Sequence, residues 1–361
     1  MLRARGRRRD ASPPRDRETL AALQRLIPDD AGETRLVHVP ADRSPWTGTG
    51  LRLRASDEVS TFAGGRVFYS RLLDIWGGPV PQLWFRAGES GVFRGTRDVH
   101  TFTAADGELQ LASFPPGIWT DPSGEHRILP GERRPRGGLD VLVVRWAEDA
   151  DSTAVLHDLT AGDTSGLAAA ELDRRATLVA EPAGWTHLWD VGGSEIYRQA
   201  DDEMECATHA DVGIVKRPVD FPLTDATRLR WSWRVDELPS ELAEDTLPTH
   251  DYMSIALEFD NGHDLTWHWS AELAPGHSYR CPIPAWRERE THMVVRRGQA
   301  GLGRWVSEER AVRRDFATAV GPPPDRIVGV WLIAVSLFQR GRGRCAYAGI
   351  ELRDGERVER L

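Results

Sequence analysis

The fold is decided by three stretches in the second half of the chain: Leu229-Arg-Trp-Ser-Trp-Arg-Val235, Tyr252-Met-Ser-Ile-Ala-Leu-Glu-Phe259 and Asp264-Leu-Thr-Trp-His-Trp-Ser270. Apolar and polar residues alternate in each stretch, as in half-buried β-strands, because successive strand side chains point to opposite faces. We expect the three strands to share one sheet that buries its aromatic and aliphatic residues on one face. The other face would then hold ionisable side chains, among them Arg234, Glu258 and His268.

Length and composition indicate a soluble protein of two domains. A chain of 361 residues is long for a single compact core. With 40% hydrophobic and 28% charged residues, its composition is that of an ordinary globular protein. The formal charge of −9 argues against nucleic acid as a partner, since neutralising phosphates requires a cationic surface. The chain contains no apolar run of about 18 residues, so we expect no membrane partner.

The cysteines and the first residues predict a cytoplasmic protein. Cys206, Cys281 and Cys345 are far apart and odd in number, which favours reduced thiols over a disulfide framework or a paired-cysteine metal site. The basic stretch at the start is followed by no apolar run, so it lacks the core of a secretory signal. We expect residues 1–33 to form a disordered basic arm and a short helix, the latter at residues 17–26.

The remaining chain predicts an all-β fold of two jelly-roll-like sandwiches joined by a short helical connector. Residues 34–148 consist of short alternating runs separated by Gly, Pro and Asp, which is typical of an antiparallel sandwich. Residues 149–180 interrupt this pattern, and the helical character of Gly166–Leu178 predicts a connector there. The β pattern then resumes, and residues 181–357 are expected to form the second sandwich.

The first sandwich resembles the galactose-binding lectin family of the PA-I type. The residues that carry the resemblance are Trp46–Leu51, Asp57–Val59, Phe62–Gly65, Leu83–Gly88, Phe102–Ala104, Gly107–Leu111 and Gly138–Val143. Their order and spacing follow the family pattern. The resemblance implies a small jelly-roll sandwich, and it implies sugar binding through a calcium ion held by two pairs of residues in loops.

The calcium ligands of that family are not kept in this chain. Its first ligand pair falls on Ser113 and Phe114, and its second falls near Asp121 and Pro122. Calcium requires six to eight oxygen ligands, and the side chains of Phe and Pro offer none. We therefore expect the calcium-dependent sugar site to be lost. Asp121 remains as the single candidate metal ligand, calcium is the only cofactor left open, and an ordinary loop role is the alternative for Asp121.

The second half, residues 182–355, resembles an uncharacterised bacterial domain family of unknown function. The residues that carry this resemblance are Leu229–Asp236, His250-Asp251, Trp267–Trp269, Arg296–Gly298, Leu302–Trp305, Glu308–Arg310 and Ala346–Ile350. The resemblance implies a β-sandwich and no particular activity. The chain departs from the family's polar pattern at His250, at Ile255 and at Ser336–Gln339.

Histidines and acids concentrate in the same region. Five of the eleven histidines are His250, His263, His268, His277 and His292, and Asp251, Glu258, Asp264 and Cys281 accompany them. Because histidine titrates near neutral pH and a carboxylate can orient it, this set is suited to proton transfer. The catalytic candidates are His268 and Asp251 as acid or base, Glu258 as the group that orients the histidine, and Arg234 as the partner of an anion. A solvent-exposed polar face is the alternative, and no metal-binding spacing is present.

Tryptophan is abundant, with 14 in the chain. The strand tryptophans are expected in the core, since aromatic side chains bury large areas and suit a pleated sheet. Candidate ligand-binding residues are the tryptophans near Pro or Gly or in loops, together with one histidine: Trp46, Trp119, Trp286, Trp305 and His250. The segment from Trp305 to Asp315 is expected to form a short helix with an ion pair between Glu309 and Arg313.

Three functions remain open from the sequence. The first is a β-sandwich protein that binds a small molecule, with glycans as one class, in an aromatic-lined cleft. The second is a cofactor-independent tailoring enzyme, a cyclase, lyase or isomerase, that uses the His/carboxylate set of the C-terminal sandwich. The third is a structural or interaction module, because a sandwich scaffold does not by itself specify function.

Overall fold

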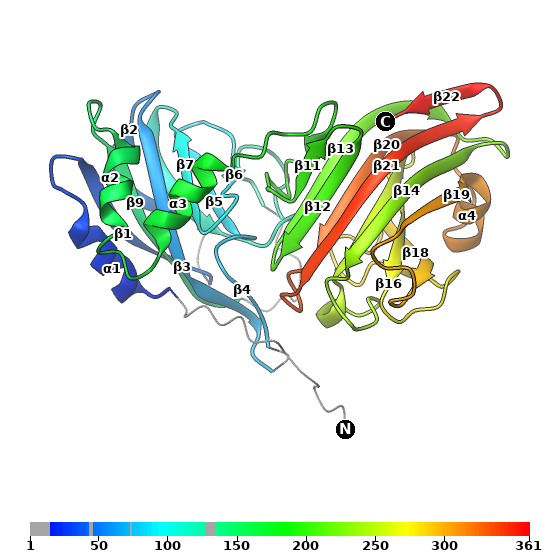
Figure 1. Ribbon diagram of the computed structural model, residues 1–361, viewed down its shortest axis with the longest axis horizontal. Coiled ribbons are helices and arrows are strands. Elements are labelled where there is room, and N and C mark those ends of the chain that lie inside the picture. Colours follow the sequence, from blue (N-terminus) through cyan, green and yellow to red (C-terminus); the bar gives the residue numbers. More distant parts are fainter. Residues whose placement is uncertain (1–14, 43–45, 73, 127–134) are drawn as a thin grey trace.

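A computed structural model describes residues 15–42, 46–72, 74–126 and 135–361. The predicted basic arm, residues 1–14, lies outside the described residues. Within the described ranges, none of the helices combines the length and the apolar character that a membrane span requires. Strands dominate the structure, so the predicted all-β class is confirmed (Figure 1).

The N-terminal sandwich packs two sheets against each other. One sheet has the order β1-β9-β3-β4 with β7 paired to β3, and the other has the order β2-β8-β5-β6. Their bounds are β1 Gly32–Pro40, β2 Thr47–Leu53, β3 Glu58–Ser70, β4 Ile75–Gly77, β5 Leu83–Ala87, β6 Phe93–Arg94, β7 Val99–Thr103, β8 Gly107–Ser113 and β9 Arg136–Trp146. Alternate residues of β9, such as Val141 and Val143, fill the core between the two sheets.

Three helices cover the outer face of the first of these sheets. They are α1 Arg17–Leu26, α2 Ser152–Leu159 and α3 Leu167–Ala176. The helix expected at residues 17–26 is therefore present, and the carboxylate of Asp16 caps it by accepting from the backbone N–H of Thr19. Leu142 and Val144 of β9 point away from the sandwich core and pack against these helices. The connector helices thus act as a third layer (Figure 1).

The C-terminal sandwich also has two sheets. The larger has the order β10-β13-β20-β15-β16-β18-β17, and the smaller has the order β11-β12-β21-β14-β19 with β22 paired to β21. Their bounds are β10 Thr186–His187, β11 Tyr197–Ala200, β12 Glu203–His209, β13 Val212–Pro222, β14 Arg228–Glu237, β15 Tyr252–Phe259, β16 Asp264–Ser270, β17 Ser278–Arg280, β18 Glu290–Arg297, β19 Trp305–Ala311, β20 Arg326–Val335, β21 Arg342–Asp354 and β22 Arg357–Arg360. The 3₁₀ turn η1 is Leu247–Thr249, and the helix α4 is Val312–Ala319.

The three opening strands lie in two sheets, not in one. β15 and β16 pair with each other in the larger sheet, whereas β14 pairs with β19 and β21 in the smaller sheet. The tryptophans of the two sheets face each other across the core, with ring centroids 6.5 Å apart for Trp231 and Trp267 and 5.8 Å apart for Trp233 and Trp269. The expected burial of these side chains is confirmed. The expected single sheet is wrong because alternation specifies a face but not a pairing partner.

The segment from Trp305 to Asp315 is a strand followed by a helix. Its first seven residues form β19 on the edge of the smaller sheet, and α4 begins only at Val312. Glu309 consequently forms an ion pair with Arg230 of the neighbouring strand and not with Arg313. The predicted helical ion pair is therefore wrong, because cross-strand neighbours replace the partners that a helix would supply.

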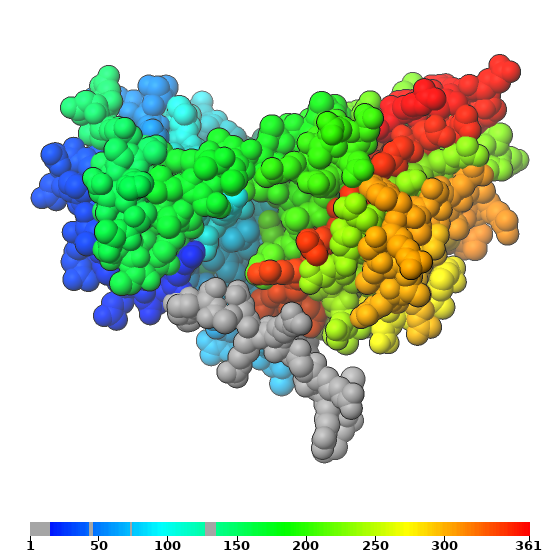
Figure 2. Space-filling view, viewed as in Figure 1, coloured from blue at the N-terminus to red at the C-terminus, as the bar shows by residue number. Residues whose placement is uncertain are grey.

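The two sandwiches meet through a buried arginine. The side chain of Arg94 in β6 has no exposed surface, and its Nη1 donates to the carboxylate of Asp211 at 2.8 Å. Its Nη2 donates to the carbonyls of Gly193 and Val212, both at 2.9 Å. Figure 2 shows the two lobes in contact over their middle, with a hollow between their upper edges. Both Nη atoms of one guanidinium group of the first sandwich thus donate to groups of the second inside the contact.

We predict that Arg94→Met strongly destabilises the contact between the sandwiches. The substitution leaves the carboxylate of Asp211 buried without its charged partner, which costs about 3–5 kcal/mol. Denaturant unfolding of the full chain measures the change. Arg326→Met is the matched control, because the pair of Arg326 with Asp220 lies on the surface, where ion pairs contribute little to stability. Equal destabilisation by the two substitutions would contradict the prediction.

Candidate functional site

Polar side chains gather on the outer face of the larger C-terminal sheet. Register places Ser254 of β15 beside His268 of β16, and places Thr266 of β16 beside His292 of β18. The neighbours of these residues along the strands, such as Trp267 and Met293, point into the sandwich core. The outer face is nevertheless buried, because His268 and His292 have no exposed surface. The alternative of a solvent-exposed polar face is therefore wrong for these residues.

Loops bring His250 and Cys281 over this face. His250 follows η1 and precedes β15, and Cys281 follows β17; both are fully buried. The Nδ1 of His250 lies 2.7 Å from the carbonyl oxygen of Glu244, and its Nε2 lies 3.5 Å from the Sγ of Cys281. Since only a protonated Nδ1 can donate to a carbonyl, the neutral ring directs the lone pair of Nε2 toward the sulfur.

Glu290 lies among the buried polar side chains on the outer face of the larger sheet. Its Oε1 accepts from the hydroxyls of Tyr252 and Thr266, both at 3.3 Å. The same oxygen lies 3.4 Å from the Nε2 of His292. The structure thus brings Cys281 and His292 together with a carboxylate that the sequence did not single out. Its position two residues before His292, on the same face of one strand, is the signal that could have identified it.

His268 lies at the other side of His292. Its Nε2 is 3.3 Å from the hydroxyl of Tyr279, and its Nδ1 has no hydrogen-bond partner among the described residues. The ring of Tyr279 stacks on that of His292, with centroids 5.0 Å apart and planes 9° apart. His268 therefore contacts aromatic side chains and another histidine, and its expected carboxylate partner is absent from its hydrogen bonds.

Burial sets the ionisation of this cluster. Burial lowers the pKa of His250 to about 3, and it holds the pKa of His268 well below its usual value, with the neighbouring His292 ring adding to both shifts. Burial alone would raise the pKa of Glu290, but the electrostatic influence of the neighbouring His292 ring outweighs burial and lowers it to about 2. Near neutral pH, His250 and His268 are neutral and Glu290 is ionised.

The other predicted catalytic residues do not join His268. Asp251 is buried, and its two carboxylate oxygens accept from the backbone N–H groups of Phe338 and Gln339 at 2.9 and 2.6 Å. Glu258 lies on the same face as His268 but pairs with Lys216 and accepts from the indole of Trp331. Arg234 belongs to the opposite sheet, where it pairs with Asp236. The expected constellation of His268, Asp251, Glu258 and Arg234 is therefore not assembled.

The predicted ligand-binding tryptophans are dispersed. Trp46 and Trp119 stack on each other with ring centroids 5.4 Å apart, and the guanidinium of Arg86 covers Trp46. Trp286 is buried beneath Arg289. Trp305 lies on an edge strand of the other sheet, 39% exposed, with Arg234 over its ring. The described residues thus do not bring these four rings together into one aromatic cleft.

The loops that correspond to the lectin calcium site make contacts within the protein. Ser113 ends β8 and is buried, and the carboxylate of Asp121 accepts from the backbone N–H and the hydroxyl of Ser123. The N–H of Gly117 donates to the carbonyl of Asp190 in the C-terminal half, at 2.7 Å. A Cβ at Gly117 would lie 3.0 Å from the indole nitrogen of Trp286, and its φ of +80° also favours glycine. This region therefore forms part of the contact between the sandwiches.

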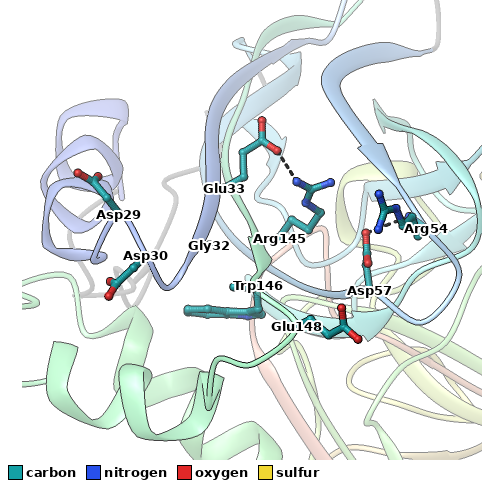
Figure 3. Close-up of a pocket in the computed structure, with 10 residues that line it drawn as sticks. Asp29, Asp30, Gly32, Glu33, Arg54, Asp57, Arg145, Trp146 and Glu148 are labelled. Atoms are coloured by element: carbon teal, nitrogen blue, oxygen red, sulfur yellow. Dashed lines mark hydrogen bonds and ion pairs between the residues drawn. The ribbon is translucent and has the colours of Figure 1, made fainter.

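A groove opens on the N-terminal sandwich, beside the start of β1 and the end of β9. Its volume is about 530 Å³, and it is lined by Asp29, Asp30, Gly32, Glu33, Arg54, Asp57, Arg145, Trp146, Ala147 and Glu148. Figure 3 shows Glu33 and Arg145 directed toward each other, with Asp29 and Asp30 to one side of this pair and their carboxylates directed away from it. The ion pair between Arg145 and Glu33 has a length of 2.7 Å. We name this feature the acidic groove, because its lining has five carboxylates and two guanidinium groups.

Part of the C-terminal sandwich is similar to an uncharacterised family. Residues 193–351 match the model of a family described as "Protein of unknown function (DUF3047)", in agreement with the expected resemblance. No curated protein matches the chain. The match defines a domain class but leaves its activity open.

Several solved structures are similar to parts of the chain. The N-terminal domain of EclA, a PllA-like lectin, is 17% identical with a TM-score of 0.24, over 31% of this chain and 95% of that chain. The xyloglucanase domain of NopAA from Sinorhizobium fredii is 8% identical with a TM-score of 0.32, over 50% and 95%. The tandem CBM22 domains of Xyn10C from Paenibacillus barcinonensis are 9% identical with a TM-score of 0.23, over 90% and 98%. Similarities of this size do not assign a ligand.

We predict that Asp251 stabilises the fold through the loop that follows β20. In Asp251→Asn, an NH₂ group replaces one acceptor oxygen and faces a backbone N–H, so unfolding should become easier by about 1–3 kcal/mol. Glu258→Gln, in the strand β15 that directly follows Asp251, is the control, because its ion pair with Lys216 is partly exposed and contributes about 1 kcal/mol or less. Thermal and denaturant unfolding measure both changes. A fully stable Asp251→Asn protein would show that the two hydrogen bonds do not matter.

Proposed function

We propose that the protein binds a small, neutral, polyhydroxylated ligand, such as a monosaccharide or disaccharide, in the acidic groove. The observation that carries the proposal is the groove itself. Its volume of about 530 Å³ lies within the range of small-molecule sites, which is about 300–1,000 Å³. It is formed by the segment after α1, the turn between β2 and β3, and the end of β9. Side chains from separate segments of the sandwich thus converge on one site.

The chemistry of the lining favours hydroxyl groups. Carboxylates accept hydrogen bonds from hydroxyls, and guanidinium groups donate to hydroxyl and ring oxygens. Arg145 is held in place by Glu33 and by its hydrogen bond to the carbonyl of Arg52 at 3.0 Å. The excess of carboxylates disfavours anionic ligands, because like charges would be brought together. A neutral sugar can use both kinds of group without that cost.

The acid–base alternative has less geometric support. His268 has no exposed surface, and the three other residues proposed to act with it lie elsewhere or have other partners. General acid–base catalysis requires the catalytic group to reach the proton of a bound substrate. Ligand binding at the acidic groove uses side chains that solvent already reaches.

We predict that the full chain binds neutral saccharides on a glycan array and in calorimetry, and that Asp30→Asn and Glu148→Gln each reduce the affinity. Both residues are exposed groove residues, so the fold should be preserved. Each charged hydrogen bond lost corresponds to about a tenfold or larger loss of affinity. Glu89→Gln, an exposed change outside the groove, is the control and should bind as the parent does.

Two results would overturn the proposal. One is an array with no neutral saccharide bound by the folded full chain. The other is saccharide binding that Asp30→Asn and Glu148→Gln leave unchanged, which would place the site outside the acidic groove.

A further inference from the structure

We propose that the C-terminal sandwich holds one zinc ion, bound by His250, Cys281 and His292 with the carboxylate of Glu290 as the fourth donor. The ligand atoms of His250, Cys281 and His292 all lie within 4.8 Å of one another. They come from the segment before β15, from the loop after β17 and from β18. We refer to these four residues as the buried donor set.

Two separations within the buried donor set, one of which involves Glu290, match those of neighbouring ligands on a tetrahedral ion. Zn–S bonds of about 2.3 Å and Zn–N or Zn–O bonds of about 2.0–2.1 Å place a sulfur and a nitrogen ligand about 3.5 Å apart, and a nitrogen and an oxygen ligand about 3.3–3.4 Å apart. The Sγ of Cys281 is 3.5 Å from the Nε2 of His250. The Oε1 of Glu290 is 3.4 Å from the Nε2 of His292. Both distances are those of neighbouring ligands.

Orphaned nitrogens are a second, independent observation. Both ring nitrogens of His292 are buried without a hydrogen-bond partner among the described residues. Leaving a buried polar group without a partner is unfavourable, and natural structures rarely do so. A metal–nitrogen bond would satisfy one of these atoms. The short distance to Glu290 does not remove the need, because its geometry is not that of a hydrogen bond.

Hydrogen bonds with neighbouring groups orient two of the four donor residues. The Nδ1–H of His250 donates to the carbonyl of Glu244 at 2.7 Å, which leaves Nε2 as the ligand atom. Metal-binding histidines commonly donate in this way to a carbonyl or carboxylate. The hydroxyls of Tyr252 and Thr266 fix the carboxylate of Glu290. The buried donor set therefore has the supporting hydrogen bonds that a metal site requires.

The chemical types of the four donor groups favour zinc over other metal ions. Calcium and magnesium take oxygen ligands, whereas a set of two imidazoles, one thiolate and one carboxylate suits zinc. His250, Cys281 and His292 have no exposed surface, and Glu290 is 4% exposed. A fully enclosed site with four protein ligands is characteristic of structural zinc. The ion would fasten the segment before β15 and the loop after β17 to the outer face of the sheet.

The test measures metal content and spectrum on the full chain. The protein is prepared with zinc in excess, passed through a desalting column and analysed for bound metal, and the result expected is one zinc per chain. Cobalt substitution should give the visible bands of a tetrahedral site together with a sulfur-to-cobalt charge-transfer band. Removal of zinc by a chelator should lower the midpoint of thermal unfolding, and added zinc should restore it.

Matched variants assign the ligands. Cys281→Ser should lose zinc and the charge-transfer band, whereas Cys206→Ser and Cys345→Ser alter buried cysteines outside the buried donor set and should keep both. Tyr252→Phe removes a hydrogen bond to Glu290 and should weaken zinc binding by about 10–100-fold. If Cys281→Ser does not fold, the band in the Cys206→Ser and Cys345→Ser proteins still identifies the sulfur ligand.

The proposal is overturned if the folded full chain binds no zinc after desalting, which would leave a thiol–imidazole hydrogen bond as the sole role of Cys281 and His250. It is equally overturned if bound cobalt shows no charge-transfer band, or if folded Cys281→Ser retains the full zinc content.

Discussion

Packing of tryptophan against tryptophan across the C-terminal sandwich is the constraint on which the other features depend. Trp231 and Trp233 of β14 face Trp267 and Trp269 of β16, and all four side chains are essentially fully buried. Because strand side chains alternate, fixing Trp267 inward fixes its neighbours Thr266 and His268 outward. The polar face of the larger sheet is thus a consequence of how the core is filled.

The polar side chains on this face require hydrogen-bond partners once loops bury them. The segment before β15 and the loop after β17 bury it and supply His250 and Cys281, while Glu290 accepts from two hydroxyls. Buried polar groups are stabilising only when they are bonded, and two nitrogens of His292 have no hydrogen-bond partner among the described residues. This imbalance is why the buried donor set is a stronger functional candidate than the dispersed tryptophans that first suggested a ligand cleft.

The errors in the expected site have a common physical origin. The alternation of residues predicts that Arg234 and His268 share a polar face, but β14 belongs to the other sheet, which places Arg234 on the opposite surface. Glu258 shares the face of His268 but lies on the neighbouring strand at the other end of the β15–β16 pair, where it contacts Lys216. Alternation determines which face a side chain takes, while pairing and register determine its neighbours. A two-residue repeat therefore cannot predict which residues of neighbouring strands lie side by side.

By itself, the sequence determined the all-β class, the helix at residues 17–26, the inward tryptophans and the concentration of histidines after residue 250. These are local properties, set by side-chain periodicity and composition. Only the tertiary structure decided that Cys281 lies against His250, 31 residues away, and that β16 and β18 run parallel so that Thr266 and His292 are neighbours. Contacts between distant segments depend on strand pairing and loop packing, and no short-range pattern encodes either.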